Sequence, residues 1–174
     1  MTFELVLFDC DGVLVDSEPI ANRILAEELT KLGLVTSYED SIQDYMGKSI
    51  VDGMKIVTEK LGYSPPDSFL SRLQERTRAA FEKQLSPILG IEEVLKQVSS
   101  KICVASSGSY DKIKNSLKLT GLSSFFGDNL FSAVDVKNGK PHPDLFLYAA
   151  NQMGVKPECC AVIEDSVPGV EAAM

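Results

Sequence analysis

The chain has 174 residues, of which 44% are hydrophobic and 24% are charged, and its formal net charge is −8 at pH 7. This length and composition are typical of a globular protein with one core domain and room for an inserted module. The excess of acidic residues disfavours nucleic acid and anionic membranes as main partners, because both are bound through patches of Lys and Arg.

Targeting signals and disulfide frameworks are not expected. No apolar run reaches the roughly 18 residues that a membrane span requires, and the N-terminus shows no basic region followed by an apolar core. The four Cys residues form no C-x-x-C pair, so reduced thiols in a cytoplasmic protein are the simplest interpretation. With one His in the chain, a His-based metal cluster and a Ser-His-Asp triad are both disfavoured.

A buried strand is predicted at residues 3–8, an apolar run that ends abruptly in an acidic turn. A helix is predicted from Ser17 to about Leu32, because one stripe of residues recurs at steps of three and four. The stripe comprises Ile20, Ile24, Leu25, Glu28, Leu29 and Leu32. Further helices are predicted at residues 39–46, 49–61 and 67–85. Residues 16–86 show no clear strand signal and are therefore expected to form an all-helical module.

Strands and helices alternate in the second half of the chain. The strands are predicted at residues 101–106, 130–133 and 159–163, and the helices at 91–99, 110–119, 143–153 and from about Val167. Such alternation predicts a parallel sheet with helices on both faces, and the apolar N-terminal strand belongs in the same sheet. The expected fold is α/β, with a Rossmann-like parallel-sheet core formed by residues 1–15 and 87–174 and an inserted helical domain at 16–86.

Asp9 and Asp11 form the first candidate site. They stand two positions apart where a strand ends, so their side chains tend to point the same way, and Gly12 permits a turn that other residues resist. Mg²⁺ can relieve the repulsion between two such carboxylates, since it prefers a few carboxylates together with water and phosphate oxygens. Asp9 can then attack a phosphoryl group to form an aspartyl-phosphate, while Asp11 acts as general acid and base. Taken alone, a D-x-D pair is more often a turn or a helix cap.

The full string LVLFDCDGVLVDSE resembles the first motif of the haloacid dehalogenase superfamily of phosphotransferases, D-x-D-G-[TV]-L-x-D-[ST]. The resemblance implies three further motifs, and the chain contains them in order. Ser106 would bind the transferring phosphoryl group, with Ser107 and Gly108 offering backbone N–H groups. Lys140, in GKPHPD, would offset the charge of Asp9 and of the phosphoryl oxygens.

The last implied motif is the acidic pair Glu164 and Asp165 in AVIEDSVPGVEAA. By resemblance Asp165 is a direct ligand of Mg²⁺, and Glu164 binds the metal directly or through water. Asp9 would contribute a side-chain oxygen to the metal and Asp11 its backbone carbonyl. All four motifs fall where predicted strands end, which is where open α/β sheets bind their ligands.

The helical stretch 16–86 occupies the position of the cap domain of this superfamily, which closes over the site and contacts the leaving group. The resemblance is strongest to the β-phosphoglucomutase-like branch of sugar-phosphate phosphatases. The strings DNLFSAVDVKNGKPHPDLF and VIEDSVPGVEAA are similar to members of the 6-phosphogluconate phosphatase type. The resemblance therefore implies a Mg²⁺-dependent phosphatase whose partner is a small phosphorylated metabolite.

A phosphomutase of the same fold is the alternative enzyme. By resemblance a mutase carries a His where this chain has Ala21, and an Arg on a cap loop where this chain has Ile50. Without that Arg a second phosphate lacks a bidentate partner, although Lys48 in the same loop could partly replace it as a substrate-binding residue. These differences favour a phosphatase. Asp11 disfavours a dehalogenase, which has no leaving alcohol to protonate.

The chain ends at Met174, within the helix predicted after the last motif, whereas superfamily members continue with further strands. The C-terminal part of the core is therefore expected to be missing, and an uncovered edge strand carries a risk of association. A truncated, non-catalytic metal-binding domain is the third interpretation. We expect a monomer or a weak homo-oligomer.

Overall fold

The computed structural model describes residues 3–46, 48 and 50–174. The chain divides into two compact units. We call the first, Met1–Asp16 together with Leu85–Met174, the core unit, and the second, Ser17–Gln84, the helical unit.

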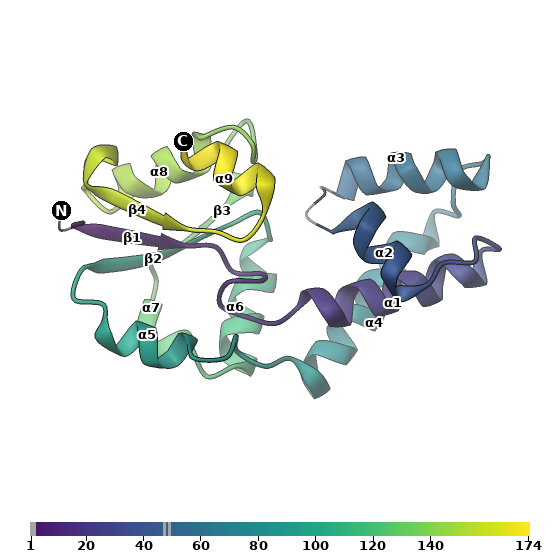
Figure 1. The fold of residues 1–174 in the computed structure, drawn as a ribbon, viewed down its shortest axis with the longest axis horizontal. Coiled ribbons are helices and arrows are strands. Elements are labelled where there is room, and N and C mark those ends of the chain that lie inside the picture. The colour runs from purple at the N-terminus through teal and green to yellow at the C-terminus, as the bar shows by residue number, and fades with distance from the viewer. Residues whose placement is uncertain (1–2, 47, 49) are drawn as a thin grey trace. The chain divides into compact units, whose positions relative to one another are not determined.

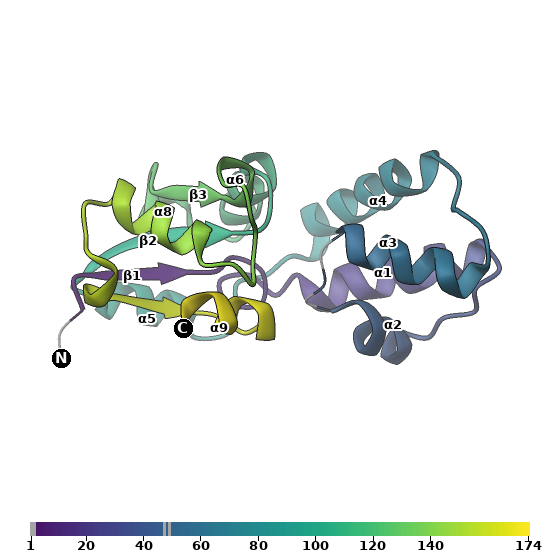
Figure 2. The same cartoon turned by 90° about the horizontal axis from the view of Figure 1, so that it is seen from above.

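A four-stranded parallel sheet forms the centre of the core unit (Figure 1). Its strands are β1 (Leu5–Phe8), β2 (Lys101–Ser106), β3 (Leu130–Ser132) and β4 (Cys160–Ile163), arranged in the order β3-β2-β1-β4. Phe8 lies opposite Val104 of β2 and Ile163 of β4, so the carboxyl ends of these strands meet at one edge (Figure 2). The predicted parallel α/β sheet is confirmed, with the first strand beginning at Leu5 rather than at residue 3.

Helices cover both faces of the sheet, with α8 and α9 above it and α5 and α7 below it in Figure 1. The helices of the core unit are α5 (Ile91–Gln97), α6 (Tyr110–Leu119), α7 (Ser123–Phe126), α8 (Asp144–Gln152) and α9 (Val167–Ala173). Successive strand residues point to opposite faces of the sheet and so belong to two separate apolar clusters. Phe8 and Val104 pack with α5, α6 and α7, while Leu7 and Cys103 pack with α8 and α9. Burial on both faces explains why these strands are continuous apolar runs in the sequence.

Three short elements of the core unit are not indicated by the sequence pattern. Helix α7 has four residues, too few for a helical period to be visible. Its Phe126 packs edge-on against Phe8 of β1, with ring centroids 6.0 Å apart. Two 3₁₀ turns, at Ala133–Asp135 and Pro157–Cys159, are equally short. All three are too short to show a helical repeat in the sequence.

The described residues of the helical unit form four helices: α1 (Glu18–Lys31), α2 (Tyr38–Tyr45), α3 (Ile50–Leu61) and α4 (Ser68–Gln84). Leu29, Tyr45, Val57 and Phe69, one from each helix, form its buried centre. An amphipathic helix is stabilised mainly by burial of its apolar face, so packing in this shared centre stabilises all four helices.

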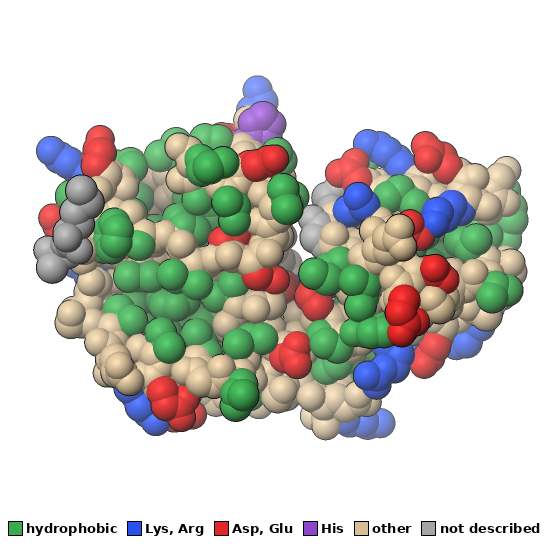
Figure 3. All heavy atoms as spheres, viewed as in Figure 1, with side chains coloured by type: hydrophobic (Ala, Val, Ile, Leu, Met, Phe, Trp, Pro, Cys, Tyr) green, Lys and Arg blue, Asp and Glu red, His purple; other side chains and the backbone are tan. Residues whose placement is uncertain are grey.

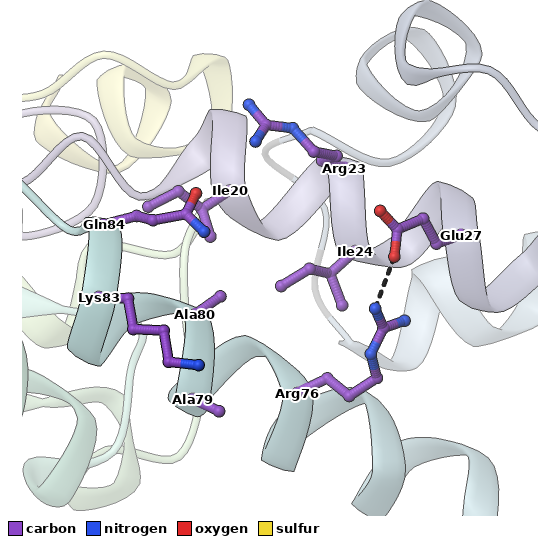
Figure 4. Close-up of a pocket in the computed structure, with 9 residues that line it drawn as sticks. All are labelled: Ile20, Arg23, Ile24, Glu27, Arg76, Ala79, Ala80, Lys83 and Gln84. Carbon is purple, nitrogen blue, oxygen red and sulfur yellow. Dashed lines mark hydrogen bonds and ion pairs between the residues drawn. The ribbon is translucent and has the colours of Figure 1, made fainter.

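Charged side chains also join α1 to α4. Glu28 of α1 is 1% exposed and accepts hydrogen bonds from Arg72 and Arg76 of α4. Arg76 also pairs with Glu27 at 2.5 Å, the contact drawn in Figure 4. The two helices line a groove, shown in the same view. Its lining residues are Ile20, Arg23, Ile24, Glu27, Arg76, Ala79, Ala80, Lys83 and Gln84.

Part of the core unit's surface is apolar (Figure 3). Ile163 at the end of β4 and Val167 and Val170 of α9 are exposed. Strand β4 lies at one end of the strand order, with β1 as its neighbour. Among the residues that the structure describes, no helix is both long enough and apolar enough to cross a membrane.

Candidate active site

The carboxyl ends of the strands bring three of the predicted motifs together. Asp9 directly follows β1, Ser106 is the last residue of β2, and Glu164 directly follows β4. Because these strands are parallel and in register, the three residues lie at the same edge of the sheet. Lys140 comes from the segment between β3 and α8, and its side chain reaches the same edge.

Lys140 joins two of the carboxylates. Its Nζ lies 2.7 Å from Oδ1 of Asp9 and 2.5 Å from Oε2 of Glu164, and its side chain is 7% exposed. The ammonium also lies 5.1 Å from the ring centroid of Phe146. Buried charges are unfavourable unless they are paired, so the lysine and the two carboxylates stabilise one another. The contact with Asp9 is the one that the predicted role of Lys140 requires.

Burial shifts the pKa values of the acidic groups. It raises the pKa of Asp9 from 3.8 to about 7, although Lys140 acts in the opposite direction. Burial also raises the pKa of Asp165, and the charge of Glu164 adds to the effect. At Glu164 burial again acts upward, but hydrogen bonds from Lys140 and Ser166 outweigh it and lower the pKa. Full ionisation of Asp9 at neutral pH therefore requires more positive charge than Lys140 provides.

Three carboxylates are placed so that they could hold a metal ion. One oxygen each of Asp9, Glu164 and Asp165 lies within 4.8 Å of the others. Two glycines leave room for them: a Cβ on Gly12 would lie 2.0 Å from Oδ2 of Asp165, and a Cβ on Gly169 would lie 2.0 Å from Cδ of Glu164. A donor set made only of carboxylate oxygens suits a hard cation such as Mg²⁺. The residues present therefore fit the metal that the resemblance implies.

The loop after β2 presents hydroxyl and backbone N–H groups. Ser106 is buried, and its Oγ accepts a hydrogen bond from the backbone N–H of Gly108 at 3.1 Å. The hydroxyl of Ser132 donates to the carbonyl oxygen of Gly108 at 2.6 Å, which holds the loop against the end of β3. Ser107 is exposed, and Ser109 caps the N-terminus of α6. Such a loop at a helix N-terminus suits a bound phosphate.

Asp11 forms an ion pair that was not predicted from the sequence. Its Oδ2 lies 2.6 Å from Nζ of Lys112, the third residue of α6. The carboxylate of Asp11 is not among the three clustered carboxylates, and its expected metal contact is through the backbone carbonyl. A cation in the first turn of a helix is disfavoured by the helix dipole, and this unfavourable placement is the sequence signal that could have indicated Lys112.

The candidate residues of the helical module belong to a different compact unit. Lys48 is exposed, Ala21 lies in α1, and Ile50 begins α3. Gly47 and Ser49, from the same loop as Lys48, lie outside the described residues. The role of Lys48 in substrate binding, and the comparison with a mutase at Ala21 and Ile50, therefore stay predictions.

The sequence and the fold are both similar to known proteins. The family model of haloacid dehalogenase-like hydrolases matches residues 3–173. A 6-phosphogluconate phosphatase of Escherichia coli strain K12 is 30% identical over 172 residues, which are 98% of this chain and 78% of the relative. A phosphorylated carbohydrates phosphatase of Thermotoga maritima is 34% identical over 177 residues, 98% of this chain and 80% of the relative. The crystal structure of a conserved haloacid dehalogenase-like protein from Agrobacterium tumefaciens strain C58 superposes with a TM-score of 0.88 at 32% identity, and the match covers 98% of this chain and 78% of that one.

Proposed function

The chain belongs to the haloacid dehalogenase-like hydrolase family, and from this we propose that it is a Mg²⁺-dependent phosphatase acting on small phosphorylated metabolites. Membership of a hydrolase family agrees with the expectation of an enzyme. The observation that carries the proposal is the buried carboxylate of Asp9, which contacts Lys140 and shares an acidic cluster with Glu164 and Asp165. In the proposed mechanism Asp9 is the nucleophile and Asp11 is the general acid and base.

The first step joins Asp9 to the phosphoryl group. A carboxylate oxygen of Asp9 attacks phosphorus in line with the ester oxygen, the bond from phosphorus to the alcohol oxygen breaks, and Asp11 gives a proton to that oxygen. Lys140 holds Oδ1 of Asp9, and Ser106 donates its hydroxyl to a phosphoryl oxygen. The products are the alcohol and an aspartyl-phosphate.

The second step regenerates Asp9. Water attacks the phosphorus of the aspartyl-phosphate while Asp11 takes a proton from the water, and the bond from phosphorus to the Asp9 oxygen breaks. Inorganic phosphate leaves. Asp11 serves both steps because the first step leaves it deprotonated and the second protonates it again.

A divalent cation held by Asp9, Glu164 and Asp165 would supply positive charge that offsets the phosphoryl oxygens and favours the ionised form of Asp9. Asp9 has a particular need of such charge. With its pKa at about 7, the buried nucleophile is partly protonated at neutral pH when only Lys140 is beside it. A protonated carboxyl group is a poor nucleophile, so activity is expected to depend on the cation.

Sugar phosphates are the proposed substrates. The support comes from the names of two relatives that match nearly the whole chain, a 6-phosphogluconate phosphatase and a phosphorylated carbohydrates phosphatase. We propose that the helical unit, which is inserted into the core unit between Asp16 and Leu85, acts as a cap that encloses the substrate and excludes water. Lys48 is the candidate residue of this unit for a contact with the substrate.

Cellular location and assembly are also proposals. All four Cys residues are free thiols, which supports a reducing compartment such as the cytoplasm. We propose a monomer or a weak homo-oligomer, and sedimentation over a range of concentrations would measure this.

A screen for phosphate release from sugar phosphates, polyol phosphates and nucleotides tests the function. We expect Asp9→Asn to release no phosphate above background, because an amide cannot form the acyl phosphate. Asp128→Asn, which changes an exposed Asp between α7 and β3, is expected to keep the wild-type rate. Excess chelator should abolish activity and added Mg²⁺ should restore it. Turnover by Asp9→Asn near the wild-type rate, or full activity in chelator, would contradict the mechanism.

The mutase alternative is separated by a second assay. A sugar 1-phosphate is incubated with a bisphosphate primer, and both free phosphate and isomerised sugar phosphate are measured. A phosphatase releases phosphate in proportion to the substrate consumed. Isomerised product without free phosphate would overturn the phosphatase proposal.

A further inference from the structure

The mechanism assigns no role to Lys112, although its ammonium contacts the general acid and base. Nζ of Lys112 lies 2.6 Å from Oδ2 of Asp11. The side chain of Lys112 is 43% exposed, whereas that of Lys140 is 7% exposed. The site thus contains a buried ammonium beside the proposed nucleophile and a more accessible one on the group that is proposed to transfer protons.

The loop after β2 leaves space for the Lys112 side chain. A Cβ on Gly108 would lie 3.3 Å from Cδ of Lys112 and 3.5 Å from Oγ of Ser106. A glycine at residue 108 therefore avoids a tight contact with the Lys112 side chain. Ser132 holds this loop in place by donating its hydroxyl to the carbonyl oxygen of Gly108. The backbone beside the Lys112 side chain is therefore held by a hydrogen bond from the end of β3.

Helix stability does not explain why a lysine occupies this position. Lys112 lies in the first turn of α6, where the helix dipole favours acidic side chains over basic ones. A hydrogen bond donated by an ammonium group is among the stronger ones in proteins, and Oδ2 of Asp11 supplies the acceptor. The lysine is therefore placed favourably with respect to Asp11 and unfavourably with respect to its own helix.

We propose that Lys112 is a positioning residue that holds the carboxyl group of Asp11 in the orientation needed for proton transfer. The inference rests on the proposed function, in which Asp11 protonates the leaving oxygen and later deprotonates water. A carboxyl group on a short side chain can rotate about its last bond, and an ammonium bound to Oδ2 restricts that rotation. General acid–base catalysis requires heavy-atom distances of roughly 2.6–3.2 Å, so a loosely held Asp11 transfers protons more slowly.

A residue that binds the substrate would behave differently in kinetic assays. Loss of a substrate contact raises KM, whereas loss of an interaction needed in the transition state lowers kcat and kcat/KM together. A residue that acts through Asp11 also loses its effect once Asp11 can no longer transfer a proton. These two criteria separate positioning of Asp11 from substrate binding by Lys112.

The experiment compares Lys112→Met, Lys112→Arg and Lys114→Met in the full chain with Mg²⁺. Lys114 is an exposed lysine of the same helix, so its variant has the same change in net charge. Lys112→Met is expected to lower kcat/KM for an alkyl phosphate about tenfold or more with KM nearly constant. Lys112→Arg should recover part of the loss, and Lys114→Met should match the wild type. Thermal melting of each variant shows whether it is folded.

Two further measurements test whether the effect passes through Asp11. In an Asp11→Asn background, adding Lys112→Met should change kcat/KM by less than about twofold. With p-nitrophenyl phosphate, whose leaving group needs little protonation, the loss of kcat/KM in Lys112→Met should be much smaller than with an alkyl phosphate.

Each outcome bears on one proposal in a distinct way. Additive effects of Lys112→Met and Asp11→Asn, or a raised KM with unchanged kcat, would overturn the positioning role while leaving the phosphatase in place. Equal losses with aryl and alkyl phosphates would do the same. If neither the wild type nor Lys114→Met releases phosphate from any ester, the proposed function itself fails, and the role of Lys112 fails with it.

Discussion

The ion-pair cluster around Glu28 leads to a quantitative prediction about the helical unit. The side chain of Glu28 is 1% exposed, and its oxygens accept hydrogen bonds from Lys31 at 2.7 Å, Arg76 at 2.7 Å and Arg72 at 3.1 Å. The hydrogen bond from Lys31, followed by those from Arg76 and Arg72, lowers the pKa of Glu28 from 4.5 to about 2 against the effect of burial. We expect Glu28→Gln, which keeps the shape and removes the charge, to destabilise the protein.

The size and the sign of the effect follow from this pKa. A pKa lowered from 4.5 to about 2 corresponds to at most about 3 kcal/mol of stability at neutral pH. The cationic partners are partly exposed and therefore screened, so we expect about 1–2 kcal/mol. Glu28 stays ionised to a lower pH in the folded protein than in the unfolded chain. The stability contributed by its ion pairs is therefore fully present above pH 4.5. It is lost as the pH falls toward about 2.

Urea unfolding followed by far-UV circular dichroism measures the effect, since the chain has no Trp. Glu59→Gln, which changes an exposed Glu of α3, is the matched control for the loss of one negative charge. The difference in unfolding free energy between Glu28→Gln and Glu59→Gln should fall by more than half between pH 7 and pH 3. A difference that is the same at both pH values, or no difference at pH 7, would refute this account of Glu28.

Two substitutions in the core unit test the acidic cluster and the buried ion pair. Gly12→Ala should abolish Mg²⁺-dependent activity, because φ at this position is +77° and the new Cβ would lie 2.0 Å from Oδ2 of Asp165. Gly33→Ala is the control: φ at Gly33 is +95°, so the backbone strain is similar, but the new Cβ would have no heavy atom within 4 Å. The folded fraction of this variant should keep wild-type activity. Equal activity losses in the two variants would argue against the assignment of Asp165 to the metal site. Lys140→Met removes the cation that pairs with Asp9 and should lower the unfolding free energy, with partial recovery in Lys140→Arg; because Asp9 can take up a proton, the loss should stay below the ~3–5 kcal/mol of a permanently charged partner. Urea unfolding of Lys140→Met at the wild-type midpoint would show that the pair contributes nothing.

The sheet could be predicted because each strand has a signal of its own. Runs such as residues 101–106 are apolar on both faces, and such runs alternate with helical segments, which indicates a parallel sheet. The sequence pattern predicted that the first strand belongs to the sheet, but it did not predict the strand order. The pairing of β1 with both β2 and β4 depends on tertiary packing. Helix α7 could not be predicted, because four residues hold about one helical turn.

The residues of the candidate site that lie at strand ends could be predicted from the sequence. The contact that the long side chain of Lys112 makes from another element could not. Asp9, Ser106 and Glu164 follow from the rule that parallel strands present their carboxyl ends at one edge. The pair of Asp11 and Lys112 joins residues 101 positions apart, and its formation depends on how α6 is oriented at the end of β2. No local pattern in the sequence encodes that orientation.

Glu28 shows the same limit in the helical unit. The helical period placed it within the buried stripe of α1 together with Leu29, although a carboxylate is seldom buried without partners. One partner, Lys31, lies three residues further along α1; the other two, Arg72 and Arg76, come from α4, where they stand four residues apart and so face the same side of the helix. A charged residue at an apolar position of a stripe therefore indicates that cations must lie nearby, but it does not indicate which ones.

The balance of charge in the candidate site gives an independent argument for a divalent cation. Asp9, Asp11, Glu164 and Asp165 carry four carboxylates, and the two lysines that contact them, Lys140 and Lys112, carry two positive charges. The excess of negative charge adds to the burial that raises the pKa of Asp9 to about 7. A bound divalent cation would offset much of this negative charge, and a phosphate dianion could then approach with less repulsion. A divalent cation offsets more of the combined negative charge of these carboxylates and the incoming phosphate than a monovalent ion does, so the balance of charge favours Mg²⁺ over Na⁺ or K⁺ as the activating ion.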